Sequence, residues 1–307
     1  MASVSTTPQT QAERSARSGF IAGVGAYLLW GFLPLLFKWL DGVDAVTIVA
    51  DRTLWSLLLV GGILVAWGRT PEIRVALADP VSRRSMLISS ALLAVNWLIY
   101  VYAVETDRVL EASFGYFINP LANVVLGMVL LGERLNRWQA VAIGIAVVAI
   151  AIQAIGLSGI PFIALGLAVT FAAYGYFRKT ARASSATGLF VETLLIAPVV
   201  VAYLGFTFIR DGGVGPHADP ATLGLLILTG PATAFPLLLF AFAVQRMRLT
   251  TIGMLQYLAP SIAFLLAITV FGEHLNPTRL VSFGLIWLSL IVYTADSVIR
   301  RRNARAG

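Results

Sequence analysis

The sequence predicts an all-α membrane protein that crosses the lipid bilayer ten times. Hydrophobic residues make up 58% of the 307 residues and charged residues only 12%, whereas about 25% of a soluble globular protein is charged. Apolar runs of about 20 residues, the length that spans a bilayer as a helix, recur along the whole chain. The pattern G-E-x-L-N at residues 132–136 returns at residues 272–276 and indicates two related halves.

Ten apolar runs, bounded by charged residues or by Gly and Pro, define the predicted helices. They are residues 20–39, 45–67, 85–104, 109–131, 138–156, 160–178, 187–209, 221–244, 248–271 and 278–296. Lipid offers no hydrogen-bond partner to free backbone groups, so each run must be helical. Residues 1–18 are expected to form a flexible cytoplasmic tail and residues 298–307 a basic one, and the first run is interpreted as a retained helix.

The basic residues predict which side of the membrane the chain ends face. Ten spans place both termini on the same side. The termini and even-numbered loops carry seventeen Lys or Arg residues against four in the odd-numbered loops, with Arg52 inside a span. The positive-inside rule therefore places both termini in the cytoplasm. This topology accounts for the net charge of +7, so no nucleic-acid partner is expected.

The two halves align with a constant offset of 140 residues. Arg108 falls on Arg248, Pro120 on Pro260 and Gly144 on Gly284. Residues 19–156 and 159–297 thus form two repeats of five helices. Because five is odd, the second repeat enters the membrane from the opposite side. Inverted repeats are typical of secondary transporters, in which solute binds near the bilayer midplane between the repeats.

The G-E-x-L-N pattern has a local structural interpretation. Gly132 and Gly272 suit the position after a helix C-terminus, and Asn136 and Asn276 suit the N-cap of the next helix. A tight turn between helices is therefore the main interpretation. A gating or coupling role for the Glu at positions 133 and 273 is the alternative.

Two charged residues lie inside predicted spans at positions related by the same offset. Arg52 belongs to the second span and Glu192 to the seventh. Counted from the beginning of its span at ~1.5 Å per residue, each lies roughly 10–12 Å deep in the membrane. Because the two spans begin on opposite sides, both residues lie near the middle, and the geometry allows an Arg–Glu pair. Such a pair either locks the structure or binds an anionic group of the substrate and responds to it. Asp51 is expected to be a wet, peripheral neighbour.

Further polar and aromatic residues of the spans are candidates for lining a solute cavity. With Arg52 and Glu192, the predicted substrate-binding residues are Asn96, Trp97, Tyr100, Tyr116, Asn119, Gln256 and Tyr257. Pro120 and Pro260 each remove a backbone hydrogen bond in mid-helix, which predicts either a fixed kink or a bend that changes access. Core packing or a membrane-interface belt is the alternative role of each aromatic.

The motifs that the sequence lacks restrict its chemistry. There is no cysteine and there are only two histidines, His217 and His274, so we predict no metal site and no cofactor. The motifs G-x-x-x-x-G-K-[ST], H-E-x-x-H and G-x-S-x-G are missing. The chain is therefore not expected to be an enzyme, and transport would be driven by gradients.

Several segments resemble the RarD group of EamA-type transporters, in the drug/metabolite transporter superfamily. They are RTLWS at 52–56, NWLIYVYAV at 96–104, LEASFGYFINPLANVVLGMVLLGERL at 110–135 and LQYLAPSIAFLLAITVFGEHL at 255–275. The resemblance covers residues 19–297 and implies ten helices in two inverted EamA repeats and a bacterial inner-membrane location. Asp51 stands where this group is expected to have His, so a proton role of that histidine does not carry over.

These observations predict a secondary transporter that exports a small organic metabolite or drug by alternating access. The expected partners are that solute and the lipid bilayer, and the sequence leaves the oligomeric state open. A non-transporting receptor or scaffold is the alternative, for which a dry, apolar interface between the repeats is expected. An intramembrane enzyme is disfavoured because neither a paired catalytic Asp nor a Ser–His set is present.

Overall fold

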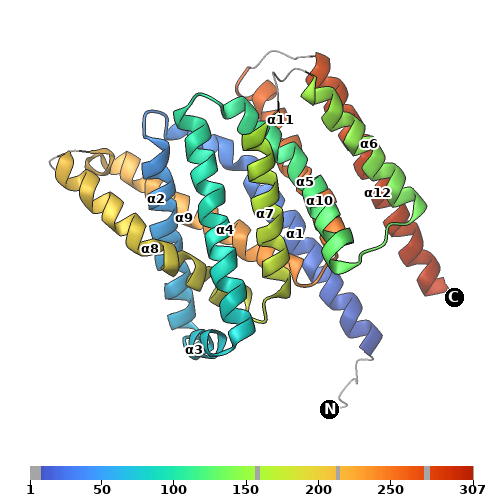
Figure 1. Ribbon diagram of the computed structural model, residues 1–307, viewed down its shortest axis with the longest axis horizontal. Coiled ribbons are helices and arrows are strands. Elements are labelled where there is room, and N and C mark those ends of the chain that lie inside the picture. The colour runs from blue at the N-terminus through green and yellow to red at the C-terminus, as the bar shows by residue number, and fades with distance from the viewer. Residues whose placement is uncertain (1–7, 156–159, 212–214, 273–276, 307) are drawn as a thin grey trace. The chain divides into compact units, whose positions relative to one another are not determined.

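The computed structural model describes residues 8–155, 160–211, 215–272 and 277–306, and over these residues it contains helices but no strands (Figure 1). The helices are α1 (Pro8–Trp39), α2 (Ala45–Ala66), α3 (Pro71–Ala78), α4 (Pro80–Glu105), α5 (Val109–Leu131), α6 (Arg137–Ala154), α7 (Phe162–Thr180), α8 (Ser185–Arg210), the 3₁₀ turn η1 (Pro216–Ala218), α9 (Pro220–Val244), α10 (Leu249–Gln256), α11 (Leu258–Thr269) and α12 (Pro277–Ala306).

Nine helical segments within the described residues are long and apolar enough to cross a membrane, with α10 and α11 counted together. The remaining predicted span, 160–178, is α7, whose last turn carries Arg178 and Lys179. The ten predicted helices are thus all present as helices. Short α3 between α2 and α4 was not predicted.

The helices at both chain ends are longer than expected. The first helix, α1, begins at Pro8, so residues 8–18 of the expected flexible tail are helical. This part of the tail is rich in Gln, Ala, Glu and Arg, which favour helix. The last helix, α12, likewise continues to Ala306.

The chain forms two compact units, and neither of them coincides with one repeat. Unit 1 comprises Met1–Ala91 and Phe177–Arg248, and unit 2 comprises Leu92–Tyr176 and Leu249–Gly307. Each unit therefore combines helices from the first and the second half of the sequence. The helices α4 and α7 each contribute to both units.

In unit 1, α2 packs against α8 and α9, and α1 packs against α9 (Figure 1). Close approach of α2 and α9 is possible because residue 230 is Gly: a Cβ there would lie 2.3 Å from Cβ of Trp55. The hydroxyl of Ser56 donates to the carbonyl of Gly230 at 3.0 Å. The ring of Tyr27 meets Phe240 edge-on and joins α1 to α9.

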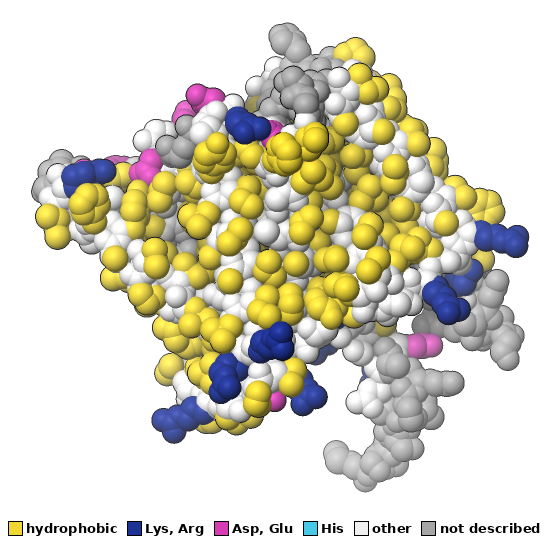
Figure 2. Space-filling model, viewed as in Figure 1, with side chains coloured by type: hydrophobic (Ala, Val, Ile, Leu, Met, Phe, Trp, Pro, Cys, Tyr) yellow, Lys and Arg dark blue, Asp and Glu magenta, His cyan; other side chains and the backbone are white. Residues whose placement is uncertain are grey.

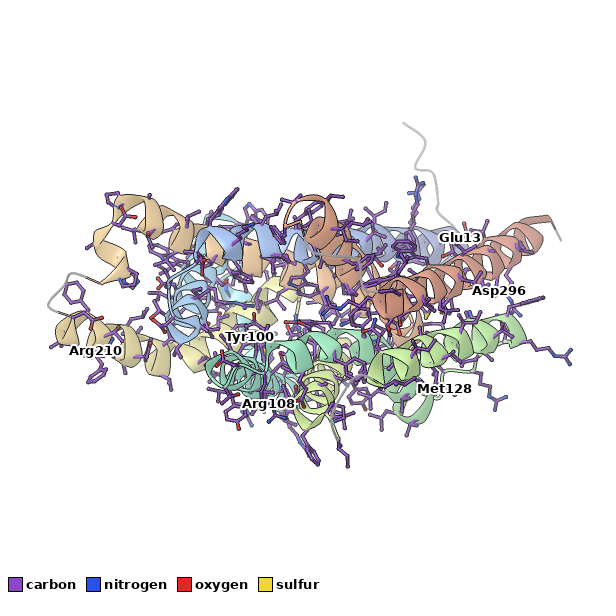
Figure 3. All side chains as sticks on the ribbon, turned by 90° about the horizontal axis from the view of Figure 1, so that it is seen from above. Glu13, Tyr100, Arg108, Met128, Arg210 and Asp296 are labelled. Atoms are coloured by element: carbon purple, nitrogen blue, oxygen red, sulfur yellow. The ribbon has the colours of Figure 1, made fainter. Side chains whose placement is uncertain are left out.

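In unit 2, α5 packs against α10, and α6 lies alongside α12 (Figure 1). The hydroxyl of Ser289 on α12 donates to the carbonyl of Ala142 on α6 at 2.6 Å. At the other end of this contact Asn136 donates to Asp296, labelled in Figure 3, at 2.6 Å. The buried cluster at this contact includes Ala146 of α6, Met254 of α10 and Ile286 of α12, and the small alanine allows close helix packing.

The first G-E-x-L-N copy is the predicted turn. Gly132 ends α5 with φ of +64°, and Asn136 and Gln139 form a capping box at the start of α6. In the second copy Gly272 also has positive φ, +68°, whereas residues 273–276 lie outside the described residues. Glu133 adds a tertiary role: its carboxylate accepts the backbone N–H groups of Leu249 and Thr250 at 2.7 and 2.9 Å, at the N-terminus of α10.

Candidate functional site

Unit 1 contains a fully buried pair of opposite charges. Arg178 at the end of α7 and Glu192 on α8 are both 0% exposed, with 3.5 Å between Arg178 Nη1 and Glu192 Oε1. The hydroxyl of Ser89 on α4 donates a short hydrogen bond to the same carboxylate oxygen, and Ser90 donates to the backbone carbonyl of Glu192 at 3.0 Å. Helices from three parts of the sequence thus meet at one carboxylate.

The position of Arg178 depends on a glycine one turn before Glu192. A Cβ at Gly188 would lie 1.7 Å from Nη1 of Arg178, so the guanidinium occupies the space that any other residue would fill. Nη2 of Arg178 donates to the carbonyl of Ser185 at 3.2 Å. The guanidinium therefore lies along one face of α8, where it contacts Ser185, Gly188 and Glu192, which are spaced three and four residues apart.

The predicted partner of Glu192 was Arg52, which lies half-buried on α2 in the same unit. Pairing of Arg52 with Glu192 stays a prediction, and the contacts established for the carboxylate are those with Arg178 and Ser89. Arg178 is one of the seventeen basic residues of the termini and even-numbered loops, yet its side chain is fully buried instead of facing water. A Gly one turn before a buried Glu was the available signal for this pair.

Asp51 is not peripheral as expected but buried, with 2% of its surface exposed. One carboxylate oxygen accepts Trp55 Nε1 at 3.2 Å, and the other lies 2.8 Å from Nε2 of His217 in η1. His217 lies in the connection between α8 and α9, beside the first turns of α2. The expectation failed because this partner is 166 residues away in sequence.

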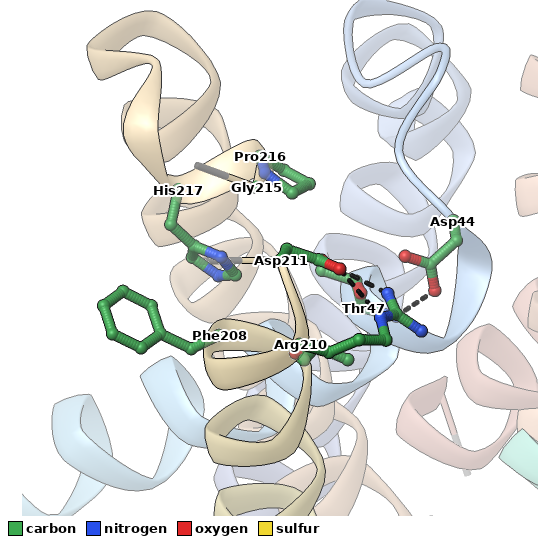
Figure 4. A pocket seen from close by; sticks show the side chains of 9 residues that line it. Asp44, Thr47, Phe208, Arg210, Asp211, Gly215, Pro216 and His217 are labelled. Carbon is green, nitrogen blue, oxygen red and sulfur yellow. Dashed lines mark hydrogen bonds and ion pairs between the residues drawn. The ribbon is translucent and has the colours of Figure 1, made fainter. Parts of the chain in front are cut away.

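A small hollow lies beside His217 in unit 1. Asp44, Thr47, Arg210 and Asp211 are among the residues that line it (Figure 4). It encloses about 20 Å³, which is room for roughly one water molecule. A drug-sized solute needs at least about 300 Å³. The hollow is therefore too small for the predicted substrate.

In unit 2 three buried amides gather where α5 meets α10. Nδ2 of Asn123 donates to Oε1 of Gln256 at 2.8 Å and to the backbone carbonyl of Asn119 at 3.4 Å. The helices approach closely here, because a Cβ at Gly253 would lie 2.5 Å from the carbonyl oxygen of Pro120. Two of the nine predicted substrate-binding residues, Asn119 and Gln256, thus belong to one cluster. Asn123 is its third member, which the predicted site omitted.

This amide cluster (Asn119, Asn123 and Gln256) has unused hydrogen-bonding capacity. Oδ1 of Asn119 and Oδ1 of Asn123 are buried without a hydrogen-bond partner among the described residues. The hydroxyl of Tyr257, a residue that is 0% exposed, likewise has no hydrogen-bond partner among the described residues. A buried polar atom without a partner costs about 1–3 kcal/mol, so these atoms point to an occupant such as solute or water.

The helix that carries Gln256 is distorted at one residue next to the cluster, Tyr257, whose dihedral angles stay helical (φ −63°, ψ −13°). The predicted ninth span is divided into α10, which ends at Gln256, and α11, which begins at Leu258. Pro260 cannot donate to the carbonyl of Gln256, the acceptor four residues before it. Pro120, at the equivalent position of the first repeat, lies within the continuous helix α5. Equivalent segments of the two repeats therefore differ by a one-residue distortion of the helix.

The other predicted residues of unit 2 lie elsewhere on α4 and α5. Nδ2 of Asn96 donates to Thr170 Oγ1 at 2.9 Å and to the carbonyl of Leu167 at 3.0 Å, both on α7. Trp97 is buried and Tyr116 is exposed, while Tyr100 packs against a cluster formed by residues of α4, α5 and α7.

Comparison with known proteins identifies the family. The model of the EamA-like transporter family matches residues 17–154 and again residues 158–295. A Pseudomonas aeruginosa protein described as an uncharacterized transporter is 41% identical over 93% of this chain and 96% of its own length. Protein RarD of Escherichia coli is 36% identical over 94% of this chain and 98% of its own length. A solved crystal structure shares the fold, with a TM-score of 0.71 at 18% identity, and the match covers 91% of this chain and 98% of the other. The chain is therefore a multi-pass membrane protein of the EamA-like transporter family, similar to its RarD members.

Proposed function

We propose that the protein is a secondary transporter that moves a small polar organic solute out of the cell across the bacterial inner membrane. The observation that carries this proposal is the amide cluster of unit 2, with its buried oxygens that lack partners. Amide oxygens accept hydrogen bonds, so the cluster favours a solute with hydroxyl, amine or amide N–H groups. A scaffold would gain nothing from these atoms, because apolar residues of the same size would be more stable.

The different conformations of the two repeats support alternating access. In transporters with inverted repeats, interrupted helices often lie beside the binding site. Here the helix is distorted at Tyr257, the one residue between α10 and α11, next to the amide cluster, whereas α5 is continuous at Pro120. Exchange of these two conformations between the repeats would give the protein a second state of similar energy. Pro120 and Pro260 are the proposed bending points of this exchange.

The remaining predicted residues are assigned by the same proposal. Gln256 and Tyr257 contact the solute beside Asn119, and Asn96, Trp97, Tyr100 and Tyr116 shape the path along α4 and α5. In unit 1, Arg52 and Glu192 respond to a charged group of the solute. The proposal places both termini in the cytoplasm, which the distribution of Lys and Arg favours.

The proposal is tested on purified protein in proteoliposomes. A thermal-shift screen against metabolites and antibiotics identifies a stabilising solute, and its uptake is measured with and without a pH gradient. Asn119→Leu removes an acceptor that has no described partner, so the melting temperature of the folded protein should stay the same or rise. Transport should fall about tenfold, which corresponds to one lost hydrogen bond of ~1.4 kcal/mol.

Gln153→Leu is the matched control, because it removes a half-buried amide in the last turn of α6, outside the cluster. It should leave transport within about twofold of wild type. Equal loss of transport in both variants would reject the amide cluster as the solute site. If no solute shifts the melting temperature and none is taken up, the receptor or scaffold alternative is favoured.

A further inference from the structure

Exposed arginines surround α3, the short helix between α2 and α4 of unit 1. Arg74 belongs to α3, Arg83 and Arg84 to the beginning of α4, and Arg182 to the connection between α7 and α8. Figure 2 shows Lys and Arg side chains among hydrophobic ones at the end where Figure 1 places α3. Within the described part of the chain, none of these four arginines forms an ion pair with a carboxylate.

Large apolar side chains are exposed among these arginines. Trp67, just before α3, is 67% exposed and Val75 is 70% exposed, and Leu77 and Val81 are exposed as well. Exposure of these large apolar side chains to water is unfavourable. Tryptophan and aliphatic side chains beside Arg are typical of protein surfaces at the level of lipid headgroups.

A carboxylate fixes α3 on the beginning of α8. Glu72 accepts from Arg69 Nε at 2.6 Å, from Thr187 Oγ1 at 2.9 Å and from Ser184 Oγ at 3.1 Å. The hydrogen bond from Arg69, with those from the two hydroxyls, lowers the pKa of Glu72 to about 2. A lowered pKa stabilises the fold at pH values above the ordinary range of Glu, and this contribution is lost only as the pH falls toward 2.

The inner face of α3 adds an apolar contact to this hydrogen-bonded anchor. Ala76 belongs to a buried cluster with Met86 of α4 and Ala183. The helix is therefore held on two neighbouring elements. Arg74, Arg83 and Arg84 are exposed, and Nη1 of Arg83 donates to the carbonyl of Leu77 in α3 at 3.4 Å.

We propose that the α3 patch, defined as Arg74, Arg83, Arg84 and Arg182 with the exposed apolar residues between them, binds the headgroup of an anionic phospholipid. Two carboxylates lie at α3 and both are engaged elsewhere: Glu72 pairs with Arg69, and Asp79 accepts from Ser82 Oγ at 2.7 Å and Ser82 N at 3.0 Å. The surplus positive charge matches a lipid phosphodiester, which arginine binds with two parallel N–H groups. Trp67 and Val75 enter the boundary between headgroups and acyl chains. This inference is independent of whether the chain transports a solute.

The test measures lipid binding by the full-length protein in detergent micelles. Native mass spectrometry records bound phosphatidylglycerol and bound phosphatidylcholine from an equimolar mixture. Wild type should bind phosphatidylglycerol preferentially. The triple variant R74Q/R83Q/R84Q should weaken that binding at least ~tenfold, since each arginine near a lipid surface contributes roughly fivefold.

Two further variants show whether a loss of lipid binding comes from the α3 patch itself, from the lower net charge of the protein or from misfolding. R14Q/R17Q/R137Q removes the same charge from exposed positions elsewhere and should change binding less than about twofold. R74K/R83K/R84K keeps the charge and should remain within about fivefold of wild type. No lipid preference in wild type, or equal losses in the two Gln triples, would overturn the proposal. So would a loss in the Lys variant as large as that in R74Q/R83Q/R84Q.

Discussion

At the scale of single residues, burial decides which charged groups matter. Isolated charges cannot be buried in an apolar medium, so Arg178 and Glu192 must be considered together. Glu192 could be predicted, since a carboxylate within an apolar run stands out. Arg178 could not, because it stands in the sequence R-K-T-A-R at a helix end, where cations normally face water. Its burial depends on the absence of a side chain at Gly188, a feature that composition and hydropathy do not reveal.

Substitution of the two predicted charged residues tests whether this region acts in transport. Arg52→Ala and Glu192→Gln are expected to abolish solute uptake in proteoliposomes while the protein still reaches the membrane. The Gln amide retains the size of Glu192 but carries no negative charge to oppose Arg178, so the expected fall in melting temperature is several degrees.

Fluorescence size-exclusion chromatography of the solubilised membranes measures how much folded protein each variant yields. Asp41→Asn, at an exposed position, is the control and should transport as wild type does. Normal uptake by both Arg52→Ala and Glu192→Gln would show that these charges have only a structural role.

At the scale of helices, the sequence was most informative where the signal is local. The turn at Gly132 and the capping box of Asn136 follow from residues that are neighbours in the chain. Bonds between distant elements were missed. The carboxylate of Glu133 accepts hydrogen bonds from two backbone amides of α10, 116 and 117 residues away. The sequence predicted a proline bend in both repeats, yet only the second is distorted.

Removal of the Glu133 carboxylate tests this contact between elements. Glu133→Ala leaves two N–H groups in the first turn of α10 without their acceptor and removes a negative charge from a helix N-terminus. The expected cost is about 1–2 kcal/mol. The melting temperature in detergent should fall by a few degrees, with a smaller change for Glu133→Gln, which retains one acceptor oxygen. An unchanged melting temperature in Glu133→Ala would contradict the capping role.

At the scale of the whole molecule, the ten helices and the two repeats could be predicted because spans and repeats are written in the linear sequence. The two compact units could not. Each unit takes helices from both repeats, so its composition depends on packing contacts such as that of Ser56 with Gly230. The predicted site residues are consequently divided: Arg52 and Glu192 belong to unit 1, and the amide cluster to unit 2.

The orientation of the molecule in the membrane is the prediction that rests on the sequence as a whole. Seventeen Lys or Arg residues in the termini and even loops, against four in the odd loops, should hold the termini in the cytoplasm, because cytoplasmic loops retain positive charge. Alkaline phosphatase, active only outside the inner membrane, should be active when inserted between residues 211 and 219. A fluorescent protein that folds in the cytoplasm should fluoresce when fused after residue 307.

The same two reporters exchanged between these positions supply the control, and both should then be inactive. The reverse pattern would place the loop with Asp211 and His217 in the cytoplasm. It would also turn α3 and its arginines to the outer leaflet. The proposed direction of transport would then lose its support, since a binding site between inverted repeats can open to either side of the membrane.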